Sequence, residues 1–340
     1  MIFKKILPRY VALDLGTTNT MVYLEDAGVV VDEPSVIAIN EFKQIEALGV
    51  EAKRMLGRTP PNIRAIRPLK DGVIADYQTA ELMLKGFLRI CLQGSSVVKP
   101  RALACVPSGI TEVEKRAVRD SLKNAGVREI FLIEEPIAAA VGMQLPIEAS
   151  TGSIVVDVGG GTTEVAVMSL GGVVVSESRK IGGDDMDAAI DRYLRNRYSV
   201  FVGEQICEQI KINIGTAVRL EEEKTMAVKG RNMITGIPNT VDLTSNEVYQ
   251  ALRETIESVV GAVRSTLERT PPELAADIVE SGVNLTGGGA LLSGLDMAIH
   301  NETNLDVRLA PKPLHTIIEG LGMILSDFSR YKRLFNLVPS

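Results

Sequence analysis

The chain has 340 residues, which is enough for two domains that each bury a core. Apolar residues make up 45% and charged residues 24%, with no low-complexity tract, so the composition argues against a disordered protein. The formal net charge of −6 argues against a general nucleic-acid binder, because such proteins need a basic surface to neutralise phosphates.

The N-terminal segment, MIFKKILPRY, mixes apolar and basic residues. On a helix its apolar side chains fall on one side, beside Lys4, Lys5 and Arg9, so we predict an amphipathic anchor for an anionic membrane. The alternative is a frayed tail, because so short a helix is marginal in water. The segment is too short for a signal peptide and no stretch could span a bilayer, so we expect a cytoplasmic protein. The predicted anchor consists of Ile2, Phe3, Ile6 and Leu7.

The first predicted strands are joined by a glycine-containing turn. Residues 10–15 and 20–24 have the composition of strands, and a turn at 26–28 leads to a further strand at 29–39. This order predicts an antiparallel meander. Asp14 ends the first strand, and the turn after it contains Gly16 together with the uncharged polar residues Thr17, Thr18 and Asn19.

Helix signals follow the meander. Thr111 and Glu114 form a capping box that predicts a helix ending at Gly126. A strand at 129–133 comes next, and Pro136 then marks the first turn of another helix. Glu135 directly precedes that proline, so we expect its carboxylate at a helix N-terminus, where the helix dipole keeps it ionised.

The segment VVDVGGGTTEVAVMSL, residues 155–170, repeats the earlier order of strand, aspartate, glycine turn and strand. A strand ends at Asp157, three glycines follow, and a second strand begins after Thr162 and Thr163. A turn at 171–172 and a strand at 173–181 continue the same order as before. The two aspartates are 143 residues apart, and the repetition predicts an internal duplication with two similar α/β halves.

The second half continues with helices and a third glycine loop. The segment 182–198 predicts a helix with Asp184, Asp185 and Asp187 favourably placed in its opening turn. A second helix is expected at 203–215, and a third, capped by Thr244, runs to about Leu267. Residues 283–295, VNLTGGGALLSGL, predict a strand, a glycine loop and the start of a helix.

The two duplicated loops suit a phosphate chain. Binding phosphate requires backbone N–H groups that converge, and only residues without a bulky Cβ let the backbone approach so closely. An aspartate at each strand end would repel bare phosphate, so we infer a Mg²⁺ ion held largely through water. We therefore predict two half-sites that bind one nucleoside triphosphate from opposite sides. No P-loop motif occurs, and three cysteines and two histidines offer no disulfide framework, zinc site or Ser-His-Asp triad.

Three motifs resemble those of actin, the sugar kinases and the DnaK-type chaperones. DLGTTNT (14–20) is similar to their first phosphate motif, VDVGGGTTEV (156–165) to the second, and LTGGGALLSGL (285–295) to the adenosine motif. Further segments resemble the MreB family of bacterial actins over nearly the whole chain. These segments are EPSVIAI (33–39), AIRPLKDGVIADY (65–77), VPSGITEVEKRAV (106–118), FLIEEPIAAAVG (131–142) and TLERTPPELAADI (266–278).

The resemblance implies a role for each matching residue. Asp14 and Asp157 would hold the Mg²⁺ shell, and the phosphates would be bound by the turns Gly16, Thr17, Thr18 and Asn19 and Gly159, Gly160, Gly161 and Thr162. Gly287, Gly288, Gly289 and Ala290 would lie under the adenosine, while Glu208 and Lys211 would reach its ribose and base. For Glu208 and Lys211 the alternative is an ordinary surface ion pair at i,i+3.

For hydrolysis the resemblance selects Glu135 and Thr162 as the pair that orients the attacking water. An ionised carboxylate near the terminal phosphate positions and polarises water more plausibly than it stores a proton. The local competitor is Glu134, whose alternative interpretation is an exposed charge at a strand end.

The resemblance also implies an actin-like ATPase fold, with two α/β halves and mixed five-stranded sheets around a nucleotide cleft. Domain I would cover 1–144, with a small subdomain at about 33–77 and a returning helix at about 318–340. Domain II would cover 145–317, with a small subdomain at about 184–245.

The partners follow from the same resemblance: ATP or ADP with Mg²⁺, further copies of the chain in paired head-to-tail filaments, and membrane proteins of cell-wall elongation. The expected location is the inner face of the cell membrane, and no nucleic acid is expected. A second membrane loop would contain Val97 and Val98, which form a weaker wedge than aromatic residues. A preference for ATP over GTP stays open.

Three other functions share the predicted fold. A DnaK-type chaperone needs a peptide-binding domain after the ATPase, yet the chain ends at Ser340. A sugar or acetate kinase needs an acceptor pocket with a catalytic base, for which the motifs leave no candidate. A bacterial actin for division or DNA segregation is disfavoured by residues 33–77, which resemble the MreB small subdomain.

Overall fold

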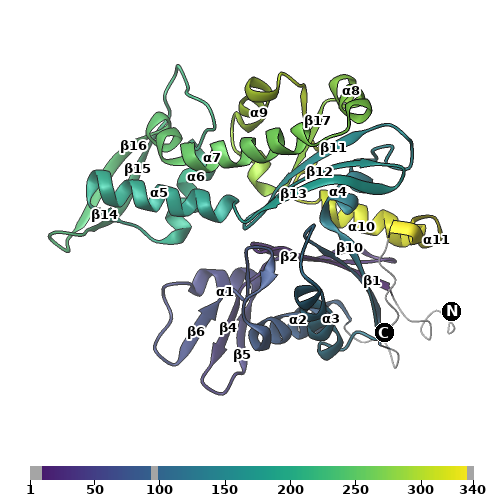
Figure 1. The fold of residues 1–340 in the computed structure, drawn as a ribbon. Helices are drawn as coiled ribbons and strands as arrows, with labels where there is room; N and C mark the ends of the chain where they lie inside the picture. Colours follow the sequence, from purple (N-terminus) through teal and green to yellow (C-terminus); the bar gives the residue numbers. More distant parts are fainter. Residues whose placement is uncertain (1–9, 93–98, 335–340) are drawn as a thin grey trace. The chain divides into compact units, whose positions relative to one another are not determined.

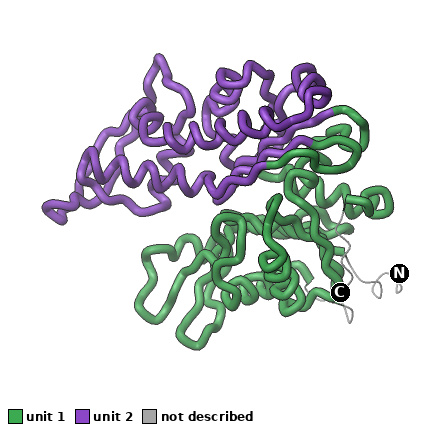
Figure 2. The backbone as a smooth tube through the Cα atoms, in the orientation of Figure 1, with its two compact units in different colours: residues 1–151, 168–176, 314–340 green, residues 152–167, 177–313 purple. Residues whose placement is uncertain are grey.

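The computed structural model describes residues 10–92 and 99–334 and divides into two compact units, coloured separately in Figure 2. Unit 1 comprises residues 1–151, 168–176 and 314–340, and unit 2 comprises 152–167 and 177–313. Both units are therefore discontinuous in sequence, and the C-terminal segment returns to the unit that contains the first strand.

A five-stranded mixed sheet forms the centre of unit 1 (Figure 1), in the order β10-β9-β1-β2-β3. The predicted meander is confirmed, because β2 is antiparallel to both β1 and β3. Strands β9 and β10 extend the sheet in parallel to β1. The bounds are β1 Tyr10–Leu15, β2 Asn19–Leu24, β3 Gly28–Pro34, β9 Arg101–Val106 and β10 Glu129–Glu134.

The prediction of a single strand over 29–39 is wrong, because this segment forms two strands. Strand β3 ends at Pro34, which has no N–H to donate to a sheet, and Ser35 turns the chain by donating its N–H to Thr18 O. The following residues form β4, which belongs to a separate small sheet of order β5-β4-β6. The short strands of unit 1 are β4 Ile37–Asn40, β5 Ile45–Leu48, β6 Ile63–Ile66, β7 Leu69–Lys70 and β8 Val73–Ile74.

The helices of unit 1 bury apolar faces against its sheet. Helix α2 begins after Asp76, whose carboxylate accepts the N–H of Thr79, and its buried residues Met83 and Phe87 join the core with Leu13 of β1. The capping box predicted at Thr111 is confirmed at the start of α3, which lies beside α2 in Figure 1. The helices are α1 Gly49–Met55, α2 Tyr77–Cys91, α3 Glu112–Asn124, α4 Glu135–Gly142, α10 Thr316–Ser326 and α11 Phe328–Tyr331, followed by the 3₁₀ turn η3 Lys332–Leu334.

Helices α4 and α10 approach each other closely enough for their backbones to touch. A Cβ at Gly142 would lie 2.1 Å from Thr316 O, and a Cβ at Gly320 would lie 1.9 Å from Ala138 O. Glycine is therefore required on both sides of the crossing. The returning helix expected at about 318–340 is interrupted at Asp327, and residues 335–340 lie outside the described residues.

Unit 2 repeats the plan of unit 1. A five-stranded sheet has the order β13-β12-β11-β17-β18, in which β11 and β17 are parallel; its residues belong to unit 2 except for 168–176 of β12 and β13, which are grouped with unit 1. Strand β11 occupies the place of β1, so the predicted duplication is visible in the topology. A hairpin, β15 and β16, forms a small sheet with β14. The bounds are β11 Ser153–Val158, β12 Thr163–Ser169, β13 Gly172–Arg179, β14 Val200–Phe201, β15 Thr225–Asn232, β16 Pro238–Thr244, β17 Val283–Thr286 and β18 Val307–Leu309.

The helices predicted in unit 2 are confirmed as α5, α6, α7 and α9, and the structure adds α8, which the sequence analysis did not predict. The capping box at Thr244 and Glu247 is confirmed at the start of α7, which ends just before the proline pair 271–272. None of the helices in the described part of the chain is long and apolar enough to cross a bilayer. The helices are α5 Gly183–Tyr198, α6 Glu204–Ile214, α7 Ser245–Glu268, α8 Pro272–Ser281 and α9 Leu295–Thr303, with a 3₁₀ turn η2 at Gly288–Leu291.

Candidate functional site

In unit 1 the predicted phosphate turn connects β1 to β2. A Cβ at Gly16 would lie 2.7 Å from Asn19 O, so only glycine fits this tight turn. Ser35, directly after β3, supports the turn, because its Oγ donates to Gly16 O over 2.7 Å. Thr17 is buried, and its Oγ1 accepts the N–H of Gly72 over 3.0 Å, so this hydroxyl supports the neighbouring β7–β8 turn.

The hydroxyl of Thr18 differs from that of Thr17. Its Oγ1 is buried and has no hydrogen-bond partner among the described residues. A buried hydroxyl without a partner is costly unless a ligand or water satisfies it. Thr18 is therefore the residue of this turn whose environment most favours an incoming phosphate oxygen.

Asp14 stands at the carboxyl end of β1, where the thiol Sγ of Cys105 on β9 lies 3.2 Å from its Oδ1 and donates a hydrogen bond. Burial raises the pKa of Asp14 to about 6; the hydrogen bond from Cys105 opposes this rise and the nearby Asp32 carboxylate adds to it. Burial and the carboxylates of Asp14 and Glu135 raise the pKa of the Cys105 thiol well above its usual range. The described side chains that act on Asp14 are thus a thiol and a second carboxylate, and a divalent cation would supply compensating positive charge.

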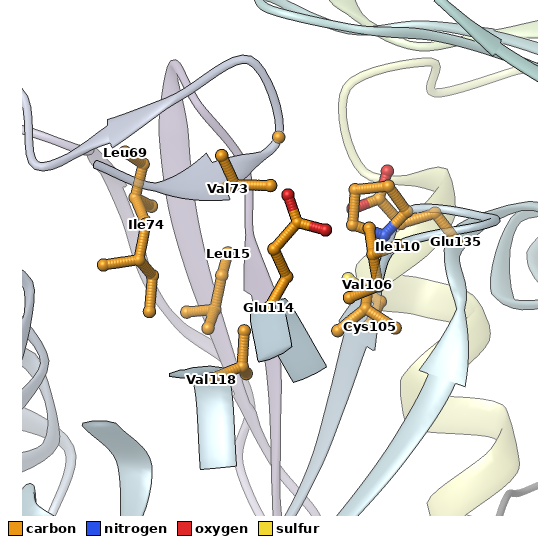
Figure 3. Close-up of a pocket in the computed structure, with 12 residues that line it drawn as sticks. Leu15, Leu69, Val73, Ile74, Cys105, Val106, Ile110, Glu114, Val118 and Glu135 are labelled. Atoms are coloured by element: carbon orange, nitrogen blue, oxygen red, sulfur yellow. The ribbon is translucent and has the colours of Figure 1, made fainter. Parts of the chain in front are cut away.

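Glu135 is the first residue of α4, and its side chain is buried. It lines a cavity of about 20 Å³ together with Cys105, Gly72 and Glu114, a volume that suits one water molecule. Figure 3 shows Glu135 and Cys105 on the same side of this cavity. Glu134, in contrast, accepts a hydrogen bond from Ser108 Oγ over 3.0 Å, which ties it to the loop after β9.

The corresponding turn of unit 2, Gly159 to Thr162, is closed by a 2.8 Å hydrogen bond from Gly159 N–H to Thr162 O. The start of α5 lies directly against this turn. The N–H groups of Gly183 and Asp184 donate to Gly159 O and Gly160 O over 3.0 and 2.8 Å. Both Gly161 and Thr162 are buried, so the predicted phosphate turn packs against the protein at these two residues.

The predicted adenosine loop of unit 2 lies beside Asp157. Strands β11 and β17 pair Asp157 with Thr286, and Gly287 follows with a φ of +88°. A Cβ on Gly287 would lie 2.2 Å from Asp157 Oδ1 and 2.4 Å from Val158 O. The next residues enter η2, where a Cβ on Gly289 would lie 2.5 Å from Val158 Cγ1, and Ala290 is buried. Asp157, the end of β17 at Thr286 and the predicted adenosine loop that begins at Gly287 therefore lie next to one another.

Gly287→Ala is therefore expected to weaken nucleotide binding at least tenfold, because the added methyl group would displace the Asp157 carboxylate, at a cost of about 1–3 kcal/mol. Isothermal titration with Mg-ADP measures the loss. The matched control is Gly203→Ala, since Gly203 has a φ of −78° and nothing within 4 Å of its added Cβ. Equal affinity in the Gly287 variant and the wild type would contradict this assignment.

Lys211 on α6 has partners that the sequence did not indicate. Its Nζ lies 2.9 Å from Asp187 Oδ1 and donates to Gly183 O over 2.8 Å. Asp187 is buried, so its predicted role as a charge in the opening turn of α5 is wrong; Asp185 takes that role by accepting the N–H of Gly182. The detectable signal was a carboxylate in line with the buried Ile190 and Leu194 of the same helix. Glu208 lies one turn before Lys211 and is partly exposed.

The ionisation of Asp187 makes a pH effect testable. Burial raises its pKa to about 6; the Lys211 ammonium opposes this rise, and the carboxylates of Glu208 and Asp184 add to it. The pKa of Asp187 in the folded state lies above the unfolded value of 3.8, so between these two values the native state binds more protons than the unfolded state. The contribution of Asp187 to the free energy of unfolding therefore falls as pH rises from about 4 to 6. The difference in unfolding free energy between Asp187→Asn and the wild type is therefore expected to shift by up to about 3 kcal/mol in favour of the variant as pH rises across this window, and to stay constant above it. Urea unfolding at pH 4, 5, 6 and 7 measures the difference, and a gap that does not change with pH would refute the assignment.

The described residues contain no group of three or more His, Cys, Asp or Glu side chains that could hold a metal. Mg²⁺ commonly binds through one or two carboxylates with water and phosphate oxygens completing its shell. Each unit contributes one carboxylate of this kind, Asp14 on β1 of unit 1 and Asp157 on β11 of unit 2. The predicted membrane residues, Ile2, Phe3, Ile6, Leu7, Val97 and Val98, all lie outside the described residues.

Comparison with known proteins gives consistent matches. A family model described as MreB/Mbl protein matches residues 8–333. The cell shape-determining protein MreB of Escherichia coli K12 is 49% identical over 329 residues, covering 95% of each chain. The MreB5 structure of Spiroplasma citri bound to ADP has a TM-score of 0.89 at 35% identity, covering 96% of this chain and 98% of that one, and a second MreB5 structure carries AMPPNP. The MamK double helical filament shares the fold, with a TM-score of 0.79 at 18% identity over 94% of this chain and 99% of that one.

Proposed function

Because the chain belongs to the MreB/Mbl family of actin-like, cell shape-determining proteins, we propose that it is an ATPase that assembles into filaments on a membrane. The observation that carries the proposal is the duplicated strand, glycine turn and strand, with an aspartate at each strand end. The protein that shares this fold at 35% identity has been solved with ADP and with AMPPNP, which supports an adenine nucleotide as the ligand.

The roles of the residues divide between the two units. In unit 1, the turn of Gly16, Thr17, Thr18 and Asn19 binds phosphate oxygens, and the Thr17 hydroxyl also accepts the N–H of Gly72. In unit 2, the turn Gly159 to Thr162 binds phosphate, and the loop of Gly287 to Ala290 lies under the adenosine. Glu208 and Lys211 recognise the ribose and base. The Mg²⁺ ion would neutralise charge on the phosphates, and Asp14 and Asp157 would orient its water shell.

Glu135 is assigned to hydrolysis, together with Thr162. Its position at the first residue of α4 places the carboxylate at the positive end of the helix dipole, which favours the ionised form. The ionised carboxylate would accept a hydrogen bond from the attacking water and hold it for in-line attack on the terminal phosphate. Glu134 is occupied by Ser108 and is the less suitable candidate.

The direct test is sedimentation of the purified chain with ATP and Mg²⁺, with and without anionic liposomes, followed by electron microscopy of the pellet. Paired filaments lying on lipid support the complete proposal. A soluble monomer that hydrolyses ATP would retain the nucleotide site and reject the cytoskeletal function. A chain that neither binds ATP nor sediments would reject both.

Membrane attachment is assigned to the N-terminal segment, with Val97 and Val98 as a second contact. Deleting residues 1–8 is therefore expected to reduce co-flotation with anionic vesicles at least tenfold, since apolar burial and attraction of basic residues to anionic lipid are lost together. The matched control replaces Val97 and Val98 by serine and leaves the N-terminus intact. Unchanged co-flotation of the deletion variant would reject the anchor, and a loss only in the valine variant would move attachment to that loop.

The proposed location is the inner face of the cell membrane, where the filament would organise membrane proteins of cell-wall elongation. The name of the E. coli relative, a cell shape-determining protein, supports this role. Depleting the protein in its own host would test it: loss of rod shape is the expected result, and normal shape would reject the role.

A further inference from the structure

The residues around Gly183 connect two parts of the proposed nucleotide site within unit 2. The N–H of Gly183 donates to Gly159 O in the phosphate turn over 3.0 Å, while its carbonyl accepts a 2.8 Å hydrogen bond from Lys211 Nζ. One peptide segment at the start of α5 thus contacts both the turn proposed to bind phosphate and the side chain proposed to reach the nucleoside.

The start of α5 packs closely against the phosphate turn and Lys211. A Cβ on Gly182 would lie 2.6 Å from both Gly159 O and Gly160 O. A Cβ on Gly183 would lie 3.2 Å from Lys211 Nζ and 3.7 Å from Gly159 O. Gly182 therefore excludes even a methyl group, and Gly183 lies in direct contact with Lys211 Nζ. In so close a packing, a shift of the Lys211 ammonium would be passed to the phosphate turn through the backbone of α5.

Asp187 determines where that ammonium lies. Its Oδ1 is 2.9 Å from Lys211 Nζ, and the side-chain exposures of the two residues are 9% and 17%. Burying an ion pair is costly and is weak evidence for added stability, so the close geometry of this pair is the observation on which a positional role rests. Asp187 lies one turn after Gly183 on α5, so the ion pair holds Lys211 of α6 against the start of α5.

We propose that Asp187, Lys211 and Gly183 form a relay that fixes the phosphate turn Gly159 to Thr162, so that Lys211 supports phosphate binding as well as nucleoside recognition. Asp187 and Gly183 are positioning residues in this relay, acting through Lys211 and the backbone. The inference rests on the proposed function insofar as the turn is taken to bind phosphate. Its structural part, the fixing of the turn, concerns the nucleotide-free chain.

Hydrogen exchange on the nucleotide-free protein tests that structural part. Lys211→Met and Asp187→Asn are each expected to speed exchange of the Gly183 and Asp184 amides about tenfold, a loss of protection equivalent to about 1.4 kcal/mol. The matched control is Asp191→Asn, which breaks the 2.7 Å ion pair with Arg195 one turn further along α5 without touching Lys211. Unchanged exchange in the first two variants, or equal acceleration in the control, would overturn the relay.

A double-mutant cycle on affinity for Mg-ATP tests the functional part. Asp187→Asn is expected to weaken binding about tenfold in the wild-type background and to have no further effect once Lys211 is methionine, because coupled neighbours are non-additive. Additive losses would show that Asp187 does not act through Lys211 and would reject the relay. A wild-type chain that fails to bind Mg-ATP would instead reject the proposed function, while the exchange experiment would still decide whether the turn is fixed as inferred.

Discussion

Asp157→Asn is expected to lower the affinity for Mg-ATP roughly 100-fold, equivalent to about 2.8 kcal/mol, while leaving the fold intact. Asparagine keeps the shape of the side chain and removes the charge that would orient the water shell of the cation. The surroundings of Asp157 leave little room for a different side chain, because Asp157 is 5% exposed and even a Cβ on Gly287 would clash with its carboxylate. Titration calorimetry with ATP in Mg²⁺ and in excess EDTA measures the effect.

Comparing ATP binding in Mg²⁺ and in EDTA separates the loss of the Asp157 charge from a distortion of the fold. With EDTA the variant and the wild type should bind ATP with similar, weak affinity, because the cation is absent in both. The control is Asp277→Asn, which alters a carboxylate of the same unit whose Oδ2 accepts the N–H of Gly152 on the entry to β11. An equal loss in both variants would attribute the effect to distortion of β11, and an unchanged Asp157 variant would reject its role at the cation.

Glu135→Ala is expected to reduce the rate of phosphate release about 100-fold or more, the range found for a positioned acid or base, with little change in ATP affinity. The carboxylate is assigned to the attacking water, which is needed only for hydrolysis, so binding and chemistry should separate. Single-turnover release of phosphate and equilibrium binding, measured on the same preparation, give the two quantities.

Glu134→Ala is the matched control, since the two glutamates are adjacent and only Glu135 lines the cavity with Cys105. Removing Glu134 breaks its hydrogen bond from Ser108 and should change stability more than rate. A wild-type rate in the Glu135 variant together with a slow Glu134 variant would transfer the catalytic role to Glu134.

The parts of the fold that sequence predicted are those with a local signal. The capping boxes at Thr111 and Thr244 lie within four residues, and the duplicated glycine turns repeat the same order of residue types, so both could be read directly. The strand expected at 29–39 failed because apolar β-branched residues continue past Pro34, while the chain itself changes sheets there.

The parts that were missed depend on distant pairs. Ser35 braces Gly16 across 19 residues, Gly72 reaches Thr17 across 55, and Cys105 reaches Asp14 across 91. Such contacts follow from how the elements pack, and a single sequence contains no periodicity that marks them. The site's backbone turns could therefore be predicted, and the side chains that hold those turns in place could not.

The discontinuity of unit 1 has a consequence for synthesis on the ribosome. The close crossing of α4 and α10 needs Thr316 and Gly320, which are made long after Gly142. During translation, the segment up to Thr151 therefore emerges with one face of α4 uncovered, while unit 2, which ends at Pro313, can complete its own sheet first. We expect the nascent N-terminal segment to expose apolar surface until the last part of the chain is made. In this protein the helix that begins with Glu135 is among the first to be synthesised and among the last to be packed.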